Sequence, residues 1–288
     1  MNVLSLFDGM SCGQIALEKC GIKVNNYFAS EIDKTAIRCT KHNYPNTIHL
    51  GSALDFKFNG LPKIDLLIGG SPCQDFSIAN KKGQSGLEGD KSKLFYTFLD
   101  VLREVKPKYF LLENVKMKKE SKLELDKYLG VSGILIDSNL VSYQNRSRYY
   151  WSNIPNITKP NDKNISFQDF KETEDCDSID YSMPNKTPSR IRMWNNGKGK
   201  NNQGSCANIT KRDKIYCLTT KQDRCPNSGM IEHKDFGRYL TRRELELAQT
   251  VPVGYTDCVS YNQAQALLGN GWTVDVIAHI FKGLNHIN

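Results

Sequence analysis

The sequence contains no apolar run long enough to cross a bilayer. Its first residues lead directly into a strand pattern, without the basic segment and separate apolar core of a secretory signal. We also find no internal repeat. These absences exclude a membrane-spanning or exported protein as the leading interpretation, and we expect a soluble protein in the cytoplasm.

Cysteine pairs at metal-ligand spacing are missing as well. The nine cysteines are odd in number and scattered, with no CxxC pair and no His/Cys cluster. This pattern favours reduced thiols over disulfides or zinc, and we predict no metal site. The cysteines are Cys12, Cys20, Cys39, Cys73, Cys176, Cys206, Cys217, Cys225 and Cys258.

The chain has 288 residues and a net charge of +8. That length suits one large α/β domain or one domain with a smaller appendage. The positive charge fits a polyanionic partner, although many ordinary soluble proteins are equally basic.

Short apolar runs alternate with helical patterns over the first 150 residues. Strands alternating with helices predict right-handed crossovers and a doubly wound, mostly parallel α/β sheet, with ligands at the carboxyl ends of the strands. One helix has its apolar face at a spacing of 3.6 residues and ends before Pro107. The expected strands are 3–7, 27–32, 64–69 and 109–114; the expected helices are 13–21, 33–43 and one through Leu94, Phe98, Val101, Leu102 and Val105.

From about Lys159 the apolar periodicity fades, and Asn, Lys, Gly, Ser and Asp dominate. This change indicates a second, smaller and irregular region. Helical periodicity returns at 241–249, where Thr-Arg-Arg-Glu resembles a capping box, and again at 274–281.

The turn after the first strand, Phe7-Asp8-Gly9-Met10-Ser11-Cys12-Gly13, has small residues and opens a helix. Such a turn lets the backbone approach a ligand, but it is equally compatible with an ordinary tight connection. The GxGxxG fingerprint is missing, which disfavours a dinucleotide. Glu31 ends the second strand, where a carboxylate can accept hydrogen bonds from ribose hydroxyls, so the two features together favour an adenosine-containing ligand.

Cys73 follows a buried strand in the segment Gly69-Gly70-Ser71-Pro72-Cys73. A lone cysteine is more often an inert core residue than a nucleophile. Its position at the carboxyl end of a strand, behind two glycines, favours the nucleophile.

Four motifs occur in order: LSLFDG (4–9), GGSPCQDFS (69–77), LLENV (111–115) and QNRSRYYW (144–151). They resemble the motifs of the DNA cytosine-5 methyltransferases, and their wording is similar to the catalytic domain of the animal de novo enzymes. The resemblance covers 1–158 and 238–288. It implies a catalytic and cofactor-binding domain at 1–158, a target-recognition region at 159–237, and a C-terminal segment at 238–288 that returns to the catalytic domain.

The same resemblance assigns catalytic roles. Cys73 resembles the nucleophile that adds to C6 of a flipped-out cytosine, and Glu113 resembles the glutamate that hydrogen-bonds or protonates N3. Arg146 and Arg148 resemble the arginines that hold the flipped base and its phosphates. A salt-bridged carboxylate for Glu113, and a solvated basic patch for the arginines, are the alternatives.

The implied cofactor is S-adenosylmethionine, with S-adenosylhomocysteine as product. Ser52 departs from the family, where an aspartate reads the adenine amino group, and Asp55 follows three residues later. Ser5 and Ser11-Cys12 follow the animal branch, whereas the segment 268–274 mixes a bacterial asparagine with an animal-type tryptophan. The cofactor residues implied by the resemblance are Phe7, Asp8, Gly9, Gly13, Glu31, Ile32, Ser52, Pro72, Leu94, Asn270 and Trp272.

The resemblance also implies double-stranded DNA as the partner of a monomeric, prokaryotic or phage-encoded enzyme. Segment 81–93 resembles a loop that closes over DNA, and a plain surface loop is the alternative. Region 159–237 offers many basic side chains for a DNA groove: Lys186, Arg190, Arg192, Lys198, Lys200, Lys211, Arg212, Lys214, Lys221 and Arg224.

Three other interpretations compete with this one. An RNA cytosine-5 methyltransferase of the same fold usually carries a Cys-Phe-Thr segment, which this sequence lacks. A catalytically dead relative would be expected to have lost the nucleophile or the acid. A nucleotide-binding oxidoreductase would be expected to carry GxGxxG.

Overall fold

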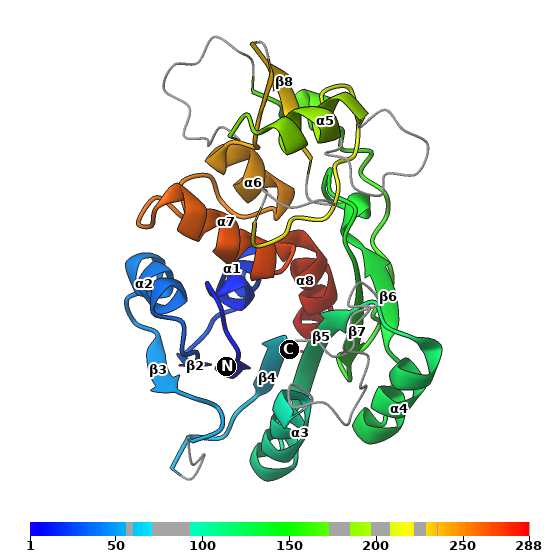
Figure 1. Ribbon diagram of the computed structural model, residues 1–288. Helices are drawn as coiled ribbons and strands as arrows, with labels where there is room; N and C mark the ends of the chain where they lie inside the picture. The colour runs from blue at the N-terminus through cyan, green and yellow to red at the C-terminus, as the bar shows by residue number, and fades with distance from the viewer. Residues whose placement is uncertain are drawn as a thin grey trace. The chain divides into compact units, whose positions relative to one another are not determined.

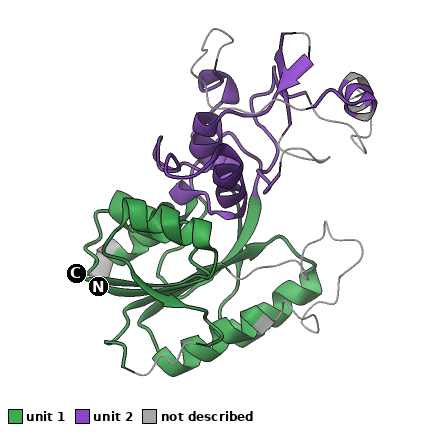
Figure 2. Cartoon of the chain, turned by 60° about the vertical axis from the view of Figure 1, so that its left-hand side comes forward, with its two compact units in different colours: residues 1–137, 147–159, 276–288 green, residues 138–146, 160–275 purple. Residues whose placement is uncertain are grey.

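The computed structural model describes residues 1–55, 60–70, 93–172, 185–196, 208–221, 229–234 and 236–287. These residues form two compact units (Figure 2). Unit 1 comprises 1–137, 147–159 and 276–288, and unit 2 comprises 138–146 and 160–275.

The described strands of unit 1 form one seven-stranded sheet in the order β3-β2-β1-β4-β5-β7-β6 (Figure 1). Strands β3, β2, β1, β4 and β5 are parallel to one another, whereas β7 is antiparallel to both β5 and β6. The predicted doubly wound, mostly parallel sheet is therefore confirmed. The strands are β1 (Asn2–Leu6), β2 (Asn26–Ser30), β3 (Ile48–Gly51), β4 (Leu66–Gly70), β5 (Tyr109–Val115), β6 (Ile134–Asp137) and β7 (Ser147–Ser152).

Helices lie on both faces of this sheet (Figure 2). The apolar face of α3 (Lys93–Val105) packs in a core with Leu4, Leu67 and Leu112 of the central strands. Asp33 caps α2 (Lys34–Asn43) by accepting hydrogen bonds from Thr35 N and Ala36 N. The other helices are α1 (Cys12–Lys19), α4 (Lys119–Leu129) and α8 (Val274–Phe281). None of the described helices is long and apolar enough to span a bilayer.

Unit 2 contains less regular structure. Its elements include α5 (Pro188–Asn196), the hairpin β8 (Ile231–His233) and β9 (Phe236–Arg238), α6 (Arg242–Ala248) and α7 (Tyr261–Asn270). The Thr241–Glu244 capping box predicted from the sequence is present at the start of α6. Glu244 also pairs with Arg238 at 2.8 Å, and both side chains are buried.

The unit boundaries differ from the expected division in two places. The expected C-terminal segment 238–288 is split, because 238–275 lies in unit 2 and 276–288 lies in unit 1. Residues 138–146, expected with the catalytic domain, also lie in unit 2. The physical reason is hydrogen bonding to α6: Tyr143 Oη donates to Glu244 O at 2.5 Å, and Gln144 Nε2 donates to Ala248 O at 2.6 Å.

Candidate active site

The turn between β1 and α1 has a strained backbone. Phe7, Gly9 and Ser11 have φ values of 57°, 58° and 65°, in the left-handed region that favours glycine. Gly9 N donates to Glu31 Oε2 at 2.8 Å, which fixes the turn to the end of β2. Non-glycine residues in this region cost about 1–3 kcal/mol each and cluster at ligand sites, so the turn is a candidate ligand-binding loop.

Gly13 is needed for the packing of α1. A Cβ atom at this position would lie 2.4 Å from Ile68 Cδ1 on β4 and 2.9 Å from Tyr27 Oη on β2. Helix α1 therefore approaches the sheet closely enough to hold the turn in place. The contacts around Gly13 indicate a packing role for a residue that was expected to bind cofactor.

Glu31 is held in one orientation by three backbone amides. Its Oε1 accepts from Ile32 N at 2.7 Å and from Asp33 N at 2.8 Å, in addition to the bond from Gly9 to Oε2. Each carboxylate oxygen has two lone pairs, so Oε2 can still accept from a ligand hydroxyl. The carboxylate is thus oriented before any ligand arrives.

Two exposed apolar side chains follow the ends of neighbouring strands. Ile32 follows β2 and is 73% exposed, and Leu54 follows β3 and is 62% exposed. Ser30 Oγ donates to Gly51 O at 2.8 Å and joins the two strand ends. Ser52, expected at the adenine, uses its Oγ to accept from Leu54 N at 3.2 Å. Apolar surface beside an oriented carboxylate fits a ligand with a flat ring and a sugar, as adenosine has.

Asp8 is a buried carboxyl group beneath this turn. Its Oδ1 accepts from Tyr27 Oη at 2.7 Å. Burial raises the pKa of Asp8 to about 6, the hydroxyls of Ser5, Tyr27 and Ser11 oppose that rise, and the charge of Glu31 adds to it. Tyr27 was not singled out from the sequence, where it reads only as one apolar residue of a strand.

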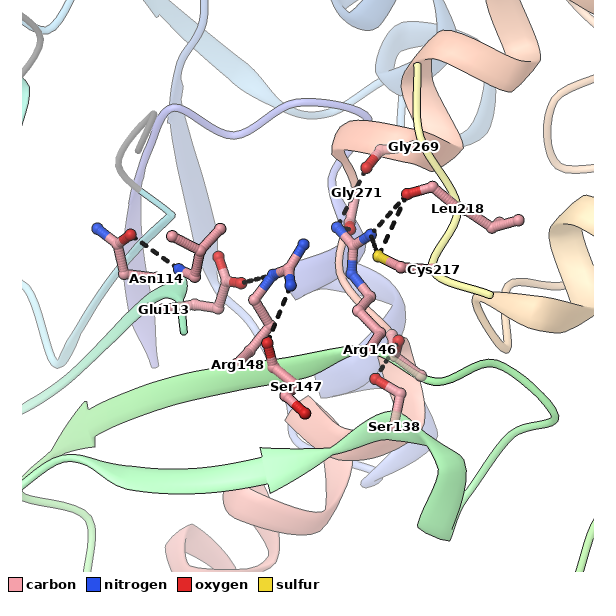
Figure 3. A network of polar contacts seen from close by, with 12 residues as sticks. Glu113, Asn114, Ser138, Arg146, Ser147, Arg148, Cys217, Leu218, Gly269 and Gly271 are labelled. Carbon is pink, nitrogen blue, oxygen red and sulfur yellow. Dashed lines mark hydrogen bonds and ion pairs between the residues drawn. The ribbon is translucent and has the colours of Figure 1, made fainter. Parts of the chain in front are cut away.

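Glu113 and Arg148 form an ion pair at the carboxyl end of β5 (Figure 3). Arg148 Nε lies 3.0 Å from Glu113 Oε1, and the two side chains are 16% and 11% exposed. The register explains the pairing, because Val115 of β5 is opposite Arg148 of β7 and Glu113 is opposite Tyr150. Arg148 Nη1 also donates to Ser147 O at 2.9 Å, which fixes the guanidinium.

Arg146 belongs to a different polar network, in unit 2. It is 4% exposed, and its guanidinium donates to Leu218 O at 3.1 Å, to Gly269 O at 3.1 Å and to Gly271 O at 2.8 Å (Figure 3). The structure therefore brings Arg148 together with Glu113 and gives Arg146 a separate set of partners.

Some of the expected site residues lie outside the part of the chain that the structure describes, and the others differ in exposure. Cys73, Pro72 and residues 81–92 lie outside the described residues, as do Lys198, Lys200 and Arg224. Leu94 and Trp272 are half-buried, and Asn270 is exposed at the end of α7. Lys214, expected at a DNA groove, donates to Asn139 O at 2.7 Å and to Ser142 O at 3.0 Å within unit 2.

Gln144 is a second residue that the sequence did not single out for a role of its own. Its Nε2 donates to Gln249 Oε1 at 2.8 Å, and its Oε1 accepts from Leu218 N at 3.1 Å. The available signal was its place at the start of the QNRSRYYW motif.

Comparison with known proteins gives sequence relatives of differing coverage. The orphan methyltransferases M.Rho11sI of Bacillus phage rho11s and M.SPRI of Bacillus phage SPR are 40% and 38% identical over 118 residues. Those matches cover 40% of this chain and span only 23% and 26% of the phage proteins. The type II methyltransferase M1.ScrFI of Lactococcus lactis subsp. cremoris is 28% identical over 308 residues, with 96% of this chain and 76% of that protein covered.

Solved structures share the fold. A methyltransferase of Entamoeba histolytica, EhMeth, has a TM-score of 0.76 at 16% identity, covering 100% of this chain and 99% of that one. The Dnmt2 methyltransferase of S. pombe has a TM-score of 0.70 at 19% identity, with the same coverage. Residues 1–180 match the family model described as C-5 cytosine-specific DNA methylase. That match includes the strained turn, Glu31 and the Glu113–Arg148 pair, and the chain belongs to the C-5 cytosine-specific DNA methylase family.

Proposed function

We propose that this protein transfers a methyl group from S-adenosylmethionine to C5 of a flipped-out cytosine in double-stranded DNA, with Cys73 as the nucleophile. The observation that carries the proposal is the Glu113–Arg148 ion pair at the carboxyl end of β5, in a chain of this family. A carboxyl group oriented by an arginine can donate a hydrogen bond or a proton to the ring nitrogen of a base when it is protonated.

The register of the sheet supports the assignment of Cys73. Gly70, the last residue of β4, is the partner of Glu113 on β5. Cys73 follows Gly70 by three residues, and a chain of three residues spans at most about 11 Å. In the proposal, the Cys73 thiolate and the Glu113 carboxyl group act on one base.

The chemistry needs both groups. C6 of cytosine is a poor electrophile and C5 is a poor nucleophile. When the Cys73 thiolate adds to C6, an electron pair moves to C5. C5 would then form its bond to the methyl group as the bond from that group to the sulfonium sulfur breaks, and S-adenosylhomocysteine would leave. Glu113 hydrogen-bonds or protonates N3 and offsets the charge that develops in the ring. Loss of the C5 proton to a base then lets the thiolate leave.

Arg148 orients Glu113 in this proposal. A side chain with one hydrogen bond to the neighbouring backbone and one ion pair to Glu113 has little freedom to rotate. Orientation of the carboxylate before the base arrives lowers the reorganisation needed in the transition state.

The residues around the strained turn fit the cofactor. Glu31 would accept the ribose hydroxyls, Ile32 would cover the adenine, and the turn at Phe7–Gly9 would lie against the methionine part. When bound, S-adenosylmethionine supplies a methyl group activated by a positive sulfonium. Asn270, Trp272, Ser52, Pro72 and Leu94 are also included in this proposed cofactor set.

Region 159–237 would recognise the DNA. Exposed basic side chains of unit 2, such as Lys211, Arg212 and Lys221, suit contacts to phosphates. Base flipping costs a few kcal/mol, because the stacked base hides its C6 face. The proposal includes a monomeric enzyme acting in the cytoplasm on DNA of a cell or a phage.

The experiment measures transfer of labelled methyl groups to duplex DNA and, separately, to RNA of matched sequence. The wild-type protein should label duplex DNA, and Cys73→Ser should abolish labelling while duplex binding persists. Cys258→Ser, which changes a half-buried thiol of unit 2, is the matched control and should keep full activity. Labelling of RNA alone, or full activity of Cys73→Ser, would overturn the proposal.

A further inference from the structure

Arg146 is a buried arginine whose terminal N–H groups all have acceptors within the chain. Nη1 donates to Cys217 Sγ at 3.3 Å and to Leu218 O at 3.1 Å. Nη2 donates to Gly269 O at 3.1 Å and to Gly271 O at 2.8 Å. The two terminal nitrogens carry four N–H groups, and four acceptors are present, so these donors are already committed.

The acceptors lie on two segments of unit 2 that are distant in sequence. One segment is Cys217–Leu218, and the other is the turn Gly269–Gly271 at the end of α7. The planar guanidinium is suited to bridge them, because its two amino groups point in fixed directions.

A close approach of the same two segments is visible at Gly269. A Cβ atom at this position would lie 2.4 Å from Thr219 C and 2.5 Å from Thr219 O. These are backbone atoms and cannot rotate away. Only glycine at position 269 therefore allows this turn to contact the segment around Thr219. This close approach is independent evidence, because it does not involve the hydrogen bonds of Arg146.

Further buried side chains fix the turn. Gln249 Nε2 donates to Leu268 O at 2.5 Å and to Gly271 O at 3.2 Å, and Gln249 Oε1 accepts from Thr273 Oγ1 at 2.8 Å. Gln144 Nε2 donates to the same Gln249 oxygen at 2.8 Å. The carbonyl of Gly271 thus receives hydrogen bonds from both Arg146 and Gln249.

We propose that Arg146 is a positioning residue, which joins the segment 217–219 to the turn 269–271 and makes no contact with the flipped base or its phosphates. The inference rests on the proposed function and refines it. Segment 217–219 lies in the proposed recognition region. The turn 269–271 carries Asn270 of the proposed cofactor set and is followed directly by Trp272 of that set. Arg146 thereby links a DNA-recognition segment to a cofactor-binding turn.

Three variants test the link. Arg146→Lys keeps the charge but has one nitrogen in place of the guanidinium fork, and Gly269→Ala forces the segments apart. Cys217→Ala is a milder change that removes one acceptor. Arg243→Lys is the matched control, since Arg243 is a half-exposed arginine of the same unit.

The first measurement is amide hydrogen exchange of the protein without DNA. Arg146→Lys and Gly269→Ala should each raise exchange about tenfold in both 215–221 and 267–273, because the hydrogen bonds that hold both segments are weakened together. Cys217→Ala should show a smaller rise in the same peptides, and Arg243→Lys should show none. Unchanged protection in Arg146→Lys, or a rise in one segment alone, would overturn the link.

The second measurement is the dissociation constant of S-adenosylhomocysteine, measured by calorimetry on the same DNA-free proteins. A positioning role predicts about tenfold weaker binding in Arg146→Lys, because the turn is displaced even when no DNA is present. An arginine that held the base or its phosphates would leave this constant unchanged and weaken DNA binding alone, which would refute the proposal.

Both measurements are independent of methyl transfer. If the wild-type protein failed to methylate DNA, the proposed function would fall while the exchange result still decided whether Arg146 joins the two segments. If the wild type methylated DNA and Arg146→Lys lost only DNA affinity, the proposed function would stand and the positioning role would fall.

Discussion

The carboxyl edge of the unit 1 sheet and the polar network of unit 2 each use one arginine from the run Arg146-Ser147-Arg148. At the carboxyl end of β5, Arg148 pairs with the carboxylate of Glu113. In unit 2, the Arg146 guanidinium donates hydrogen bonds to backbone carbonyls and to a thiol. Two arginines of one motif thus have different kinds of partner. We propose that Arg148 serves the reaction and that Arg146 holds segments together.

The largest effect is expected at the sheet edge. Glu113→Gln should lower the rate of methyl transfer by about 10²–10⁴-fold, since an amide cannot protonate N3. Its affinity for S-adenosylhomocysteine should stay near wild type. Single-turnover kinetics with labelled cofactor measures this, and a rate within a factor of two or so of wild type would remove Glu113 from the reaction.

Breaking a buried pair in unit 2 should act on stability instead. Glu244→Gln removes the charge that faces Arg238, and Glu244 Oε1 and Oε2 both accept hydrogen bonds from that guanidinium. Loss of one partner of a buried pair costs about 3–5 kcal/mol. Urea denaturation should show the loss. A stability equal to that of wild type would mean that the pair does not hold unit 2 together.

Arg148→Ala should have a smaller effect on rate than Glu113→Gln. The carboxyl group remains but loses its orientation, and we expect a fall in kcat of about 100-fold, as for one lost electrostatic contact. Arg146→Lys should instead weaken cofactor binding, so the pair of variants separates the two regions. If both variants lost kcat equally and kept the cofactor affinity of wild type, the two arginines would not have the different roles proposed for them.

The smallest effect concerns Asp8. Because burial raises its pKa to about 6, the native state favours the neutral carboxyl, and the stability from this group is present below its usual pKa of 3.8 and is lost as pH rises through 6. Asp8→Asn should therefore flatten the dependence of the thermal midpoint on pH between about 4 and 7. An identical pH profile for the variant and the wild type would show that Asp8 is not buried as described.

Periodicity predicted most of unit 1. The central strands β1, β2, β4 and β5 and helices α1, α2 and α3 are where apolar patterns indicated them, because each buries a continuous apolar run or face. Strands β6 and β7 were not predicted, since both are only partly buried and carry charged residues such as Asp137 and Arg148. Strand β7 is placed by pairing with β5, and β6 is placed by pairing with β7, which a local pattern does not reveal.

The candidate site, too, could be predicted only in part from the sequence. Glu31 could be identified because it follows a strand end, where ligands of a parallel sheet bind, whereas Glu113 was identified from the resemblance of LLENV to a family motif. The partners of Arg146 could not, because they lie 71, 72, 123 and 125 residues away in the sequence. The strain at Phe7 and Ser11 was equally hidden, since neither residue type favours a positive φ.

The most direct test of the central claim uses duplex DNA that contains 5-fluorocytosine, in the presence of S-adenosylmethionine. Fluorine cannot leave as a proton does, so the thiolate stays attached to C6. Mass spectrometry of the digested adduct should find the modified base on the peptide that contains Cys73. An adduct on another residue, or no adduct on DNA that the protein binds, would contradict the proposed reaction.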